Sequence, residues 1–167
     1  ILALVGNRID LNGSVISTEG GQIYLTSLTS GLVGIKRTGS ELGLSENNLT
    51  KYQDINLNQQ SLVDVSGEQT STVFLVGKNV NILDESFVLS QNQGNLPSGS
   101  LNIQASESLV VSGRSVKSDV RSNIRSENFN TGEGARGYAS KSRKSTYKAF
   151  RQILKFQIKL DICLKTV

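Results

Sequence analysis

The sequence predicts an all-β protein whose short strands stack as the coils of a parallel β-helix. Triplets that place two apolar side chains on one face recur between polar turns, and three residues are too few for a strand of a β-sandwich. In a β-helix each short strand pairs with its counterpart one coil away, so strands of this length are sufficient. The triplets are clearest at 73–75, 80–82, 87–89, 101–103 and 109–111.

The composition favours a narrow solenoid interior. Of the 167 residues, 37% are hydrophobic but only 5% are aromatic, so Val, Ile and Leu supply most of the apolar surface. Small aliphatic side chains stack well where one position recurs coil after coil. The chain has 16 Gly, many Ser and Asn residues and a single Pro, which is typical of a polar β protein. Its length favours one domain.

The first coil is predicted from three apolar segments near the N-terminus, at 2–4, 9–11 and 15–16. Gly6 to Arg8 and Asn12 to Ser14 separate them, and Gly and Asn mark corners because they tolerate a positive φ. A Gly-rich turn at 19–21 then leads the chain into the next segment, 23–25.

Residues 28–54 interrupt this rhythm and are predicted to leave the coil, as a small hairpin or an irregular loop. Ser, Thr, Gly and charged residues dominate the segment, and its apolar residues keep no period of two. The triplets return at 55–57 and 63–65, and residues 66–69 form the next corner.

The predicted coils begin at Leu2, Ile23, Val73 and Leu101, which are 21, 50 and 28 residues apart. Subtraction of the 27-residue excursion from the long interval leaves 23, so the three spacings lie between 21 and 28 residues. About four coils are expected, which would span only about 20 Å along the axis. We therefore interpret residues 1–137 as β-helix coils.

Residues 138–167 form a divergent basic tail in this interpretation. The net charge of +4 hides an asymmetry: residues 1–137 carry 10 Lys or Arg against 13 Asp or Glu, whereas the tail carries 8 against Asp161 alone. A fifth coil would open after Gly137, but a basic segment without alternation follows, and 138–149 is expected to be poorly ordered. Residues 156–164 alternate apolar and polar and predict a strand, although Phe150, Ile153, Leu154 and Gln157 would also fit a short helix.

No residue stands out as catalytic, cofactor-binding or metal-ligating. The chain has no His, so it lacks the commonest general base and transition-metal ligand, and Cys163 is alone. Carboxylates are still candidate catalytic groups, because some glycosidases and lyases are parallel β-helices. Asp10, Asn81 and Asn102 lie in the middle of their triplets and are predicted to line one outer face, with three further acids nearer corners, namely Asp54, Asp64 and Asp84.

Solvation and turn chemistry explain these polar residues better than a site does. The Asp84-Glu85 pair fits a turn, and the Asn and Asp residues near corners need no bound Ca²⁺, since the Gly-rich calcium-binding repeat is absent. Asn12 and Asn48 begin N-glycosylation sequons that we interpret as chance matches. The basic residues of the tail could contact phosphates or an anionic membrane surface, with Tyr138, Tyr147 and Phe150 interleaved for stacking, but no nucleic-acid partner is expected.

The sequence predicts no membrane-spanning helix and shows no signal-peptide pattern in its first residues. No apolar run reaches 18 residues, and the N-terminus lacks the basic and apolar regions of a signal peptide. The chain contains no Met and begins with Ile1, so we expect a fragment or a processed product.

Several segments in consecutive order resemble filamentous haemagglutinin-like exoproteins, particularly those of cyanobacteria. They are residues 4–13 (LVGNRIDLNG), 19–25 (EGGQIYL), 52–57 (YQDINL), 63–68 (VDVSGE) and 101–108 (LNIQASES). The resemblance implies a right-handed parallel β-helix that is exported through an outer-membrane two-partner secretion transporter. The localisation that it implies is extracellular or at the outer-membrane surface.

Two departures from this family set limits on the resemblance. The secretion domain of such proteins is N-terminal and carries Asn-Pro motifs, whereas the single proline here is Pro97 after Leu96, so the chain resembles an internal segment. The tail after Gly137 matches nothing in the family pattern, as a frameshift, a truncated gene copy or a divergent end would explain.

The expected function is therefore structural and adhesive, without catalysis. An elongated stalk would present weak contact sites, with the excursion at 28–54 as the contact surface for carbohydrate or for a neighbouring or host cell. The alternative is a carbohydrate-active β-helix enzyme or a polysaccharide-binding module, which convergent outward carboxylates would favour.

Overall fold

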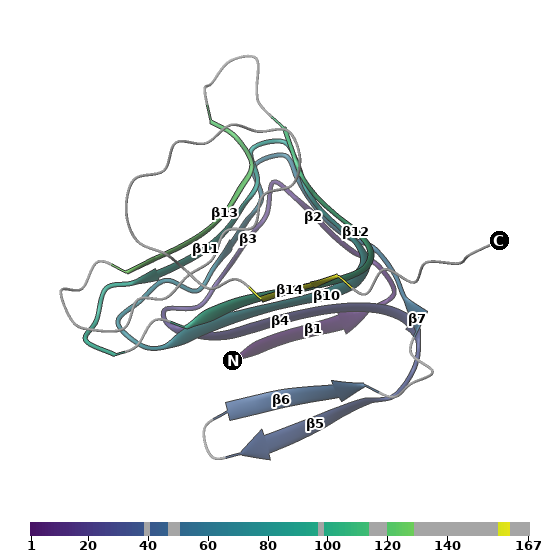
Figure 1. Ribbon diagram of the computed structural model, residues 1–167, viewed down its shortest axis with the longest axis horizontal. Coiled ribbons are helices and arrows are strands. Elements are labelled where there is room, and N and C mark those ends of the chain that lie inside the picture. The colour runs from purple at the N-terminus through teal and green to yellow at the C-terminus, as the bar shows by residue number, and fades with distance from the viewer. Residues whose placement is uncertain (39–40, 47–50, 97–98, 114–119, 129–156, 161–167) are drawn as a thin grey trace.

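The computed structural model is all-β, with mostly parallel strands in curled sheets (Figure 1). It describes residues 1–38, 41–46, 51–96, 99–113, 120–128 and 157–160. This part of the chain contains no helix, so the predicted fold class is confirmed at the level of secondary structure.

Most of the strands are short, whereas β4, β10 and β12 have 10, 12 and 12 residues. In order they are β1 (Leu2–Gly6), β2 (Ile9–Asn12), β3 (Val15–Ser17), β4 (Gly21–Ser30), β5 (Val33–Thr38), β6 (Glu41–Glu46), β7 (Lys51–Tyr52), β8 (Ile55–Asn58), β9 (Leu62–Asp64), β10 (Ser71–Ile82), β11 (Phe87–Asn92), β12 (Ser100–Val111), β13 (Asn123–Asn128) and β14 (Gln157–Leu160).

Parallel pairing arranges the strands as three faces around a triangular interior (Figure 1). The first face contains β1, β4, the first halves of β10 and β12, and β14. The second face contains β2, β8 and the second halves of β10 and β12, and the third contains β3, β9, β11 and β13. Strands β10 and β12 bend from the first face to the second, where their pairing shifts register between Gly77 and Asn79.

The four residues predicted to begin the coils lie side by side on the first face. Leu2 pairs with Ile23, Ile23 with Val73, and Val73 with Leu101. We call each circuit of three faces a layer, so successive layers align these residues as their spacing in the sequence predicts. Within the layers, each strand pairs with a strand of the next layer rather than with its neighbour along the chain.

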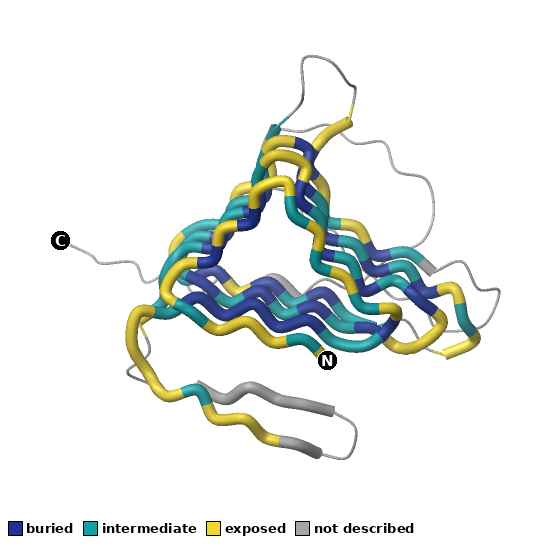
Figure 2. Tube along the Cα trace, turned by 180° about the vertical axis from the view of Figure 1, so that it is seen from behind, coloured by how far each residue is buried: buried dark blue, intermediate teal, exposed yellow. Residues whose placement is uncertain are grey.

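The same register builds a core of apolar columns that run from layer to layer. Inward residues are fully or almost fully buried in the middle layers and alternate with outward residues along each strand (Figure 2). Burial of one such side chain contributes about 1.5–3 kcal/mol to folding. The columns are Leu2–Ile23–Val73–Leu101, Leu4–Leu25–Leu75–Ile103, Ile9–Ile55–Val80–Leu109, Leu11–Leu57–Ile82–Val111 and Ile16–Val63–Val88–Ile124.

The corner between the second and third faces takes a left-handed backbone in every layer. The first layer has Gly13 there with a φ of 57°, which agrees with the predicted Gly corner. In the later layers most of these positions are occupied by residues other than Gly and Asn. A left-handed backbone costs each such residue a modest strain energy, because its Cβ crowds the backbone. In the later layers the positive-φ residues at this corner are Gln59, Gln60, Asp84, Glu85 and Gly113.

The excursion contains an antiparallel hairpin, one of the two alternatives that the sequence left open. Strands β5 and β6 pair with each other in an antiparallel register from Val33 opposite Glu46 to Thr38 opposite Glu41. The hairpin lies outside the triangle of parallel strands (Figure 1). Strand β7 returns antiparallel to the end of β4, with Tyr52 opposite Leu28.

Part of the strand predicted at 156–164 is present as β14, which pairs in parallel with β12. Ile158 aligns with Ile103 and Leu160 with Ala105, so β14 extends the first face by one strand. The other predictions for the tail, including its order at 138–149, lie outside the described residues.

Truncation of Leu75 tests the buried columns. We expect Leu75→Ala to lower the free energy of unfolding by about 2–5 kcal/mol, because Leu75 is fully buried and its loss leaves a cavity. The same truncation at Leu32, which is 75% exposed, is the matched control and should cost less than about 0.5 kcal/mol. Urea unfolding followed by circular dichroism measures both, and equal losses would contradict the assignment of Leu75 to the core.

Candidate functional site: the amide ladder of the second face

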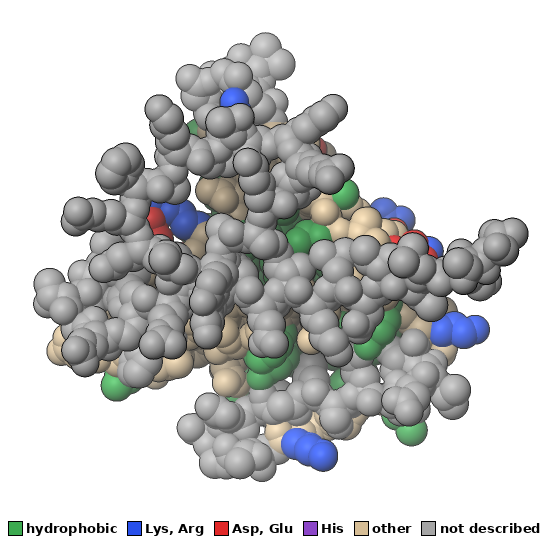
Figure 3. Space-filling model, viewed as in Figure 1, with side chains coloured by type: hydrophobic (Ala, Val, Ile, Leu, Met, Phe, Trp, Pro, Cys, Tyr) green, Lys and Arg blue, Asp and Glu red, His purple; other side chains and the backbone are tan. Residues whose placement is uncertain are grey.

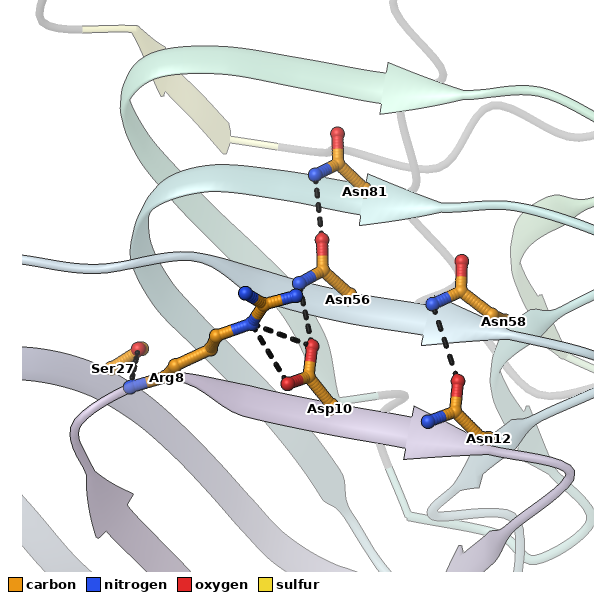
Figure 4. A network of polar contacts seen from close by, with 7 residues as sticks. All are labelled: Arg8, Asp10, Asn12, Ser27, Asn56, Asn58 and Asn81. Atoms are coloured by element: carbon orange, nitrogen blue, oxygen red, sulfur yellow. Dashed lines mark hydrogen bonds and ion pairs between the residues drawn. The ribbon is translucent and has the colours of Figure 1, made fainter.

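Three polar side chains align on the outer side of the second face. Asp10, Asn56 and Asn81 are register partners on β2, β8 and β10. The Asn56 Nδ2 donates a hydrogen bond of 2.7 Å to Asp10 Oδ1, and the Asn81 Nδ2 donates one of 2.7 Å to Asn56 Oδ1 (Figure 4). We call these three residues the amide ladder. Each rung orients the next, because an amide that donates along the stack presents its oxygen to the following layer.

Arg8 closes the ladder at the first layer. Its Nε donates to Asp10 Oδ1 at 3.0 Å and lies 2.8 Å from Oδ2, and its own amide N donates to Ser27 Oγ at 3.0 Å (Figure 4). The guanidinium remains largely exposed, at 62%, and the Asp10 side chain is 37% exposed. The ladder therefore begins at an ion pair and continues through neutral amides.

The hydrogen bond from Asn56 is the main cause that lowers the pKa of Asp10 below its ordinary value. Partial burial opposes this effect, while the hydrogen bond and the charge of Arg8 add to it. All the groups that lower this pKa stabilise the carboxylate form, so the ladder favours an ionised Asp10.

Neighbouring polar rows widen the ladder into a hydrogen-bonded surface. On one side the Asn58 Nδ2 donates to Asn12 Oδ1 at 3.4 Å (Figure 4). On the other side a row of three residues spans the layers: the Asn79 Nδ2 donates to Asp54 Oδ1 at 2.8 Å, and the Ser108 Oγ donates to Asn79 Oδ1 at 2.7 Å. Asn12, the first residue of one predicted sequon, is thus part of this surface.

The prediction that Asn102 shares a face with Asp10 and Asn81 is wrong. Asn102 aligns with Phe74 on the first face, because β12 reaches the second face only after its bend. The residue of β12 that aligns with Asn81 is Val110, and the ladder ends there. The triplet pattern identified the middle positions correctly but could not assign them to faces.

The acids predicted near corners have separate local partners. Asp64, the last residue of β9, accepts hydrogen bonds from the amide N of Ser66 at 2.8 Å and from its Oγ at 2.5 Å. Asp84 and Glu85 both have positive φ, which agrees with their interpretation as a turn. Glu85 is nearly buried and accepts a hydrogen bond of 2.8 Å from Gln60 Nε2.

No cluster of candidate metal ligands is found in the described ranges. There, no three His, Cys, Asp or Glu side chains come close enough to hold one ion. The Lys and Arg side chains visible on the face drawn in Figure 3 lie apart from one another rather than in one patch. The aromatic residues singled out in the tail, and the sequon at Asn48, lie outside the described residues.

A column of serines beside the third face was not apparent from the sequence. The amide N of Ser14 donates to Ser61 Oγ at 3.2 Å, that of Ser61 to Ser86 Oγ at 3.1 Å, and that of Ser86 to Ser122 Oγ at 3.3 Å. Ser61 and Ser86 are fully buried. These hydroxyls satisfy backbone N–H groups at the corner, where a buried unpaired donor would be costly. Because serine is frequent along the whole chain, the positions of these residues in the sequence did not indicate a column.

An aromatic pair crosses two layers on the first face. Tyr24 and Phe74 are register partners, and their rings stack with centroids 4.6 Å apart and planes 6° from parallel. Such a pair adds about 0.5–1.5 kcal/mol beyond the burial of its area. The stacked rings join β4 and β10 on the outer side of the first face, as the amide ladder joins β2, β8 and β10 on the outer side of the second face.

Comparison with models of known families, with curated proteins and with solved structures finds no match to this chain. The resemblance of residues 1–137 to filamentous haemagglutinin-like exoproteins therefore stays a prediction. In the described part of the chain no helix is long and apolar enough to cross a bilayer.

Removal of the middle rung tests the electrostatics of the ladder. We expect Asn56→Ala to raise the pKa of Asp10 toward its ordinary value, because the hydrogen bond from Asn56 is the largest cause of the lowering. Asn58→Ala, which removes an amide paired with another amide, is the matched control and should leave this pKa unchanged. An NMR titration of the Asp10 carboxyl carbon measures both, and equal titration curves for wild type and Asn56→Ala would contradict the ladder.

The lowered pKa also fixes the sign of a pH effect on stability. The folded chain holds Asp10 ionised more tightly than the unfolded chain, so the stabilisation is complete above the unfolded pKa of about 4 and disappears as the pH falls through the folded pKa. Because Asp10 is more than a third exposed, screening keeps this contribution below about 1 kcal/mol. We expect urea unfolding to show that the stability difference between wild type and Asp10→Asn shrinks as the pH falls from 5 to 2. A stability difference that does not change with pH would contradict this account.

Proposed function

We propose that the chain is a segment of a right-handed parallel β-helix that serves as a structural and adhesive stalk. The observation that carries the proposal is the row from Leu2 through Ile23 and Val73 to Leu101, which keeps one register through successive layers. A solenoid adds one layer at a time, each stabilised by its neighbours, and so forms a long rod from a simple rule. Each layer adds about 4.8 Å to the length of the rod.

The outer sides of the layers suit a rod in contact with water. The second face is covered by hydrogen-bonded amides, carboxylates and hydroxyls, among them the amide ladder. These contacts join adjacent layers without burying charge. A stalk of this kind resists bending because core, backbone and outer side chains all connect the same pairs of layers.

Export belongs to the same proposal and draws on the sequence resemblance. Segments such as 4–13, 63–68 and 101–108 resemble filamentous haemagglutinin-like exoproteins, and in such proteins a two-partner secretion transporter delivers the β-helix outside the cell. The parallel, all-β fold is compatible with that family. We therefore propose an extracellular or outer-membrane surface location.

The hairpin of β5 and β6 is the proposed contact element. It departs from the parallel layers, and recognition is concentrated on such departures from a rigid scaffold. Leu32, immediately before β5, is 75% exposed and Ile35 in β5 is 70% exposed, so the hairpin and its first residues offer apolar contacts to a carbohydrate ring or a protein on a neighbouring or host cell.

The amide ladder favours a polysaccharide-binding module as the second candidate. Amide and carboxylate groups in a regular row suit the hydroxyls of an extended sugar chain. For a carbohydrate-active enzyme, two carboxylates would have to flank one bond. Here Asp10 and Asp54 both lie on the second face but accept hydrogen bonds from different asparagines, and Asp64 lies on the third face.

Substitution of the hairpin's apolar residues tests the adhesive role. We expect Leu32→Ser with Ile35→Ser, in the chain displayed on a non-adherent bacterial strain, to reduce cell–cell aggregation and attachment to cell monolayers at least several-fold. The control is Leu96→Ser with Val110→Ser, two exposed apolar residues outside the hairpin, which should leave adhesion unchanged.

Binding to immobilised polysaccharides separates the two candidates. If Asn56→Ala abolishes binding while the hairpin variant retains it, the second candidate is correct. If the displayed wild-type chain neither aggregates cells nor attaches to any surface tested, the adhesive role is refuted.

A further inference from the structure

Strand β5 has an edge that no other described strand covers. Strands β5 and β6 form a two-stranded sheet of their own, and within the described residues neither pairs with any further strand. Figures 1 and 2 both place β6 between β5 and the first face, so the outer edge of β5 lies on the side away from the layers. Bonded and non-bonded pairs alternate along an antiparallel ladder, so every second residue of β5 directs its backbone N–H and C=O groups to this outer edge.

This edge lies at the side of the stack and not at one of its ends. The hairpin projects from the second layer, between β4 and β7, and lies outside the triangle of parallel strands (Figure 1). Further layers in a longer rod would extend the stack in the direction in which β1, β4, β10 and β12 follow one another. Stacking along that axis does not cover an edge that projects sideways.

Apolar side chains accompany the outer edge of β5. Ile35, near the middle of the strand, is 70% exposed, and Leu32, immediately before the strand, is 75% exposed. A two-stranded sheet is only marginally stable in water by itself, and additional strands stabilise it. A strand added to β5 would cover Ile35 and pair the backbone groups of the edge, which is how extended segments bind sheet edges.

The residues of β5 suit a second β5 strand as this partner. In an antiparallel pair with a two-fold axis at Ile35, that residue lies opposite Ile35 of the other copy, and Lys36 lies opposite Gly34 of the other copy. The two isoleucines form an apolar cross-strand pair, and Gly34 has no side chain to obstruct Lys36. A lysine on an edge strand opposes pairing, but in this register the two Lys36 residues do not lie opposite each other.

We propose that the outer edge of β5 binds the same edge of a second copy of this chain, so that two hairpins form one four-stranded antiparallel sheet. The strand order is β6–β5–β5–β6, and the isologous contact closes after two copies. The inference rests on the proposed role of the hairpin as the contact element, and it names the partner of that hairpin. Two rods are thereby joined through their sides.

Disulfide trapping across the two-fold axis tests the register. In a Cys163→Ser background, we expect mild oxidation of Ile35→Cys to give a linked dimer of twice the 18.0 kDa chain, because opposed residues of an antiparallel pair lie about 5 Å apart. Lys36→Cys is the matched control on the same strand, since its two cysteines would lie about 7–8 Å apart on a diagonal, beyond the reach of a disulfide. Equal trapping of both variants, or of neither, would overturn the proposal.

Sedimentation equilibrium of the full chain measures the affinity. We expect a reversible step from monomer to dimer that Ile35→Lys weakens roughly tenfold, because it replaces the apolar pair by two opposed lysines. Val110→Lys adds the same charge at an exposed valine of β12 and should leave the dimer unchanged. Circular dichroism confirms that both variants fold. A wild-type chain that stays monomeric at high concentration, or a dimer that Ile35→Lys leaves unchanged, would contradict the proposal.

Mixed aggregation of displaying cells separates this inference from the adhesive role itself. We expect cells that display the wild-type chain to aggregate with one another several-fold more than with cells that display Ile35→Lys. Equal aggregation with both kinds of cell would overturn the inference and leave the adhesive role intact, because the hairpin would then contact another surface molecule. A dimer in solution from a chain whose displayed form binds no cell would refute the adhesive role and support the inference.

Discussion

The parallel hydrogen bonds between layers set the position of every side chain in this protein. A shift of one residue in the pairing of Ile23 with Val73 would turn the inward residues of the shifted strand outward while its partner stays in place. The register cannot slip in one face alone, because β10 and β12 continue from the first face into the second. The apolar columns therefore act together, and each layer is stable only through its neighbours.

The outer features follow from the same register. Once Ile9, Ile55 and Val80 align inside, the next residue of each strand must align outside, and these residues are Asp10, Asn56 and Asn81. Their side chains differ little in length, so one amide reaches the next at 2.7 Å. The ladder is thus a consequence of the core register, and it stabilises that register in return, since a slipped strand would leave the amides without partners.

The repeated apolar triplets were sufficient to predict the all-β class and the alignment of Leu2, Ile23, Val73 and Leu101, because burial imposes its period directly on the sequence. The assignment of Asn102 failed for a geometric reason. Triplets at 101–103 and 109–111 look alike, and the bend that places them on different faces involves no proline and no clear turn residue.

The corners and the polar columns were harder to predict from the sequence than the apolar core. A positive φ at Gln59 or Glu85 is tolerated because surrounding layers impose it, and propensity argues against it. The serine column depends on which of many serines follows a corner, and coil lengths vary too much for sequence spacing to reveal it. The tail segment at 157–160 was predictable as a strand from its alternation, whereas its partner on β12 depends on tertiary contacts alone.

Disulfide cross-linking between layers tests the stacked register most directly. In a Cys163→Ser background, Asn56→Cys with Asn81→Cys places two cysteines on adjacent strands about 4.8 Å apart, within the Cα separation that a disulfide requires. We predict rapid oxidation of this pair within the monomer, and none for Asp10→Cys with Asn81→Cys, which lie two layers apart. Equal oxidation of the two pairs, or oxidation of the second alone, would contradict the stacked, in-register layers.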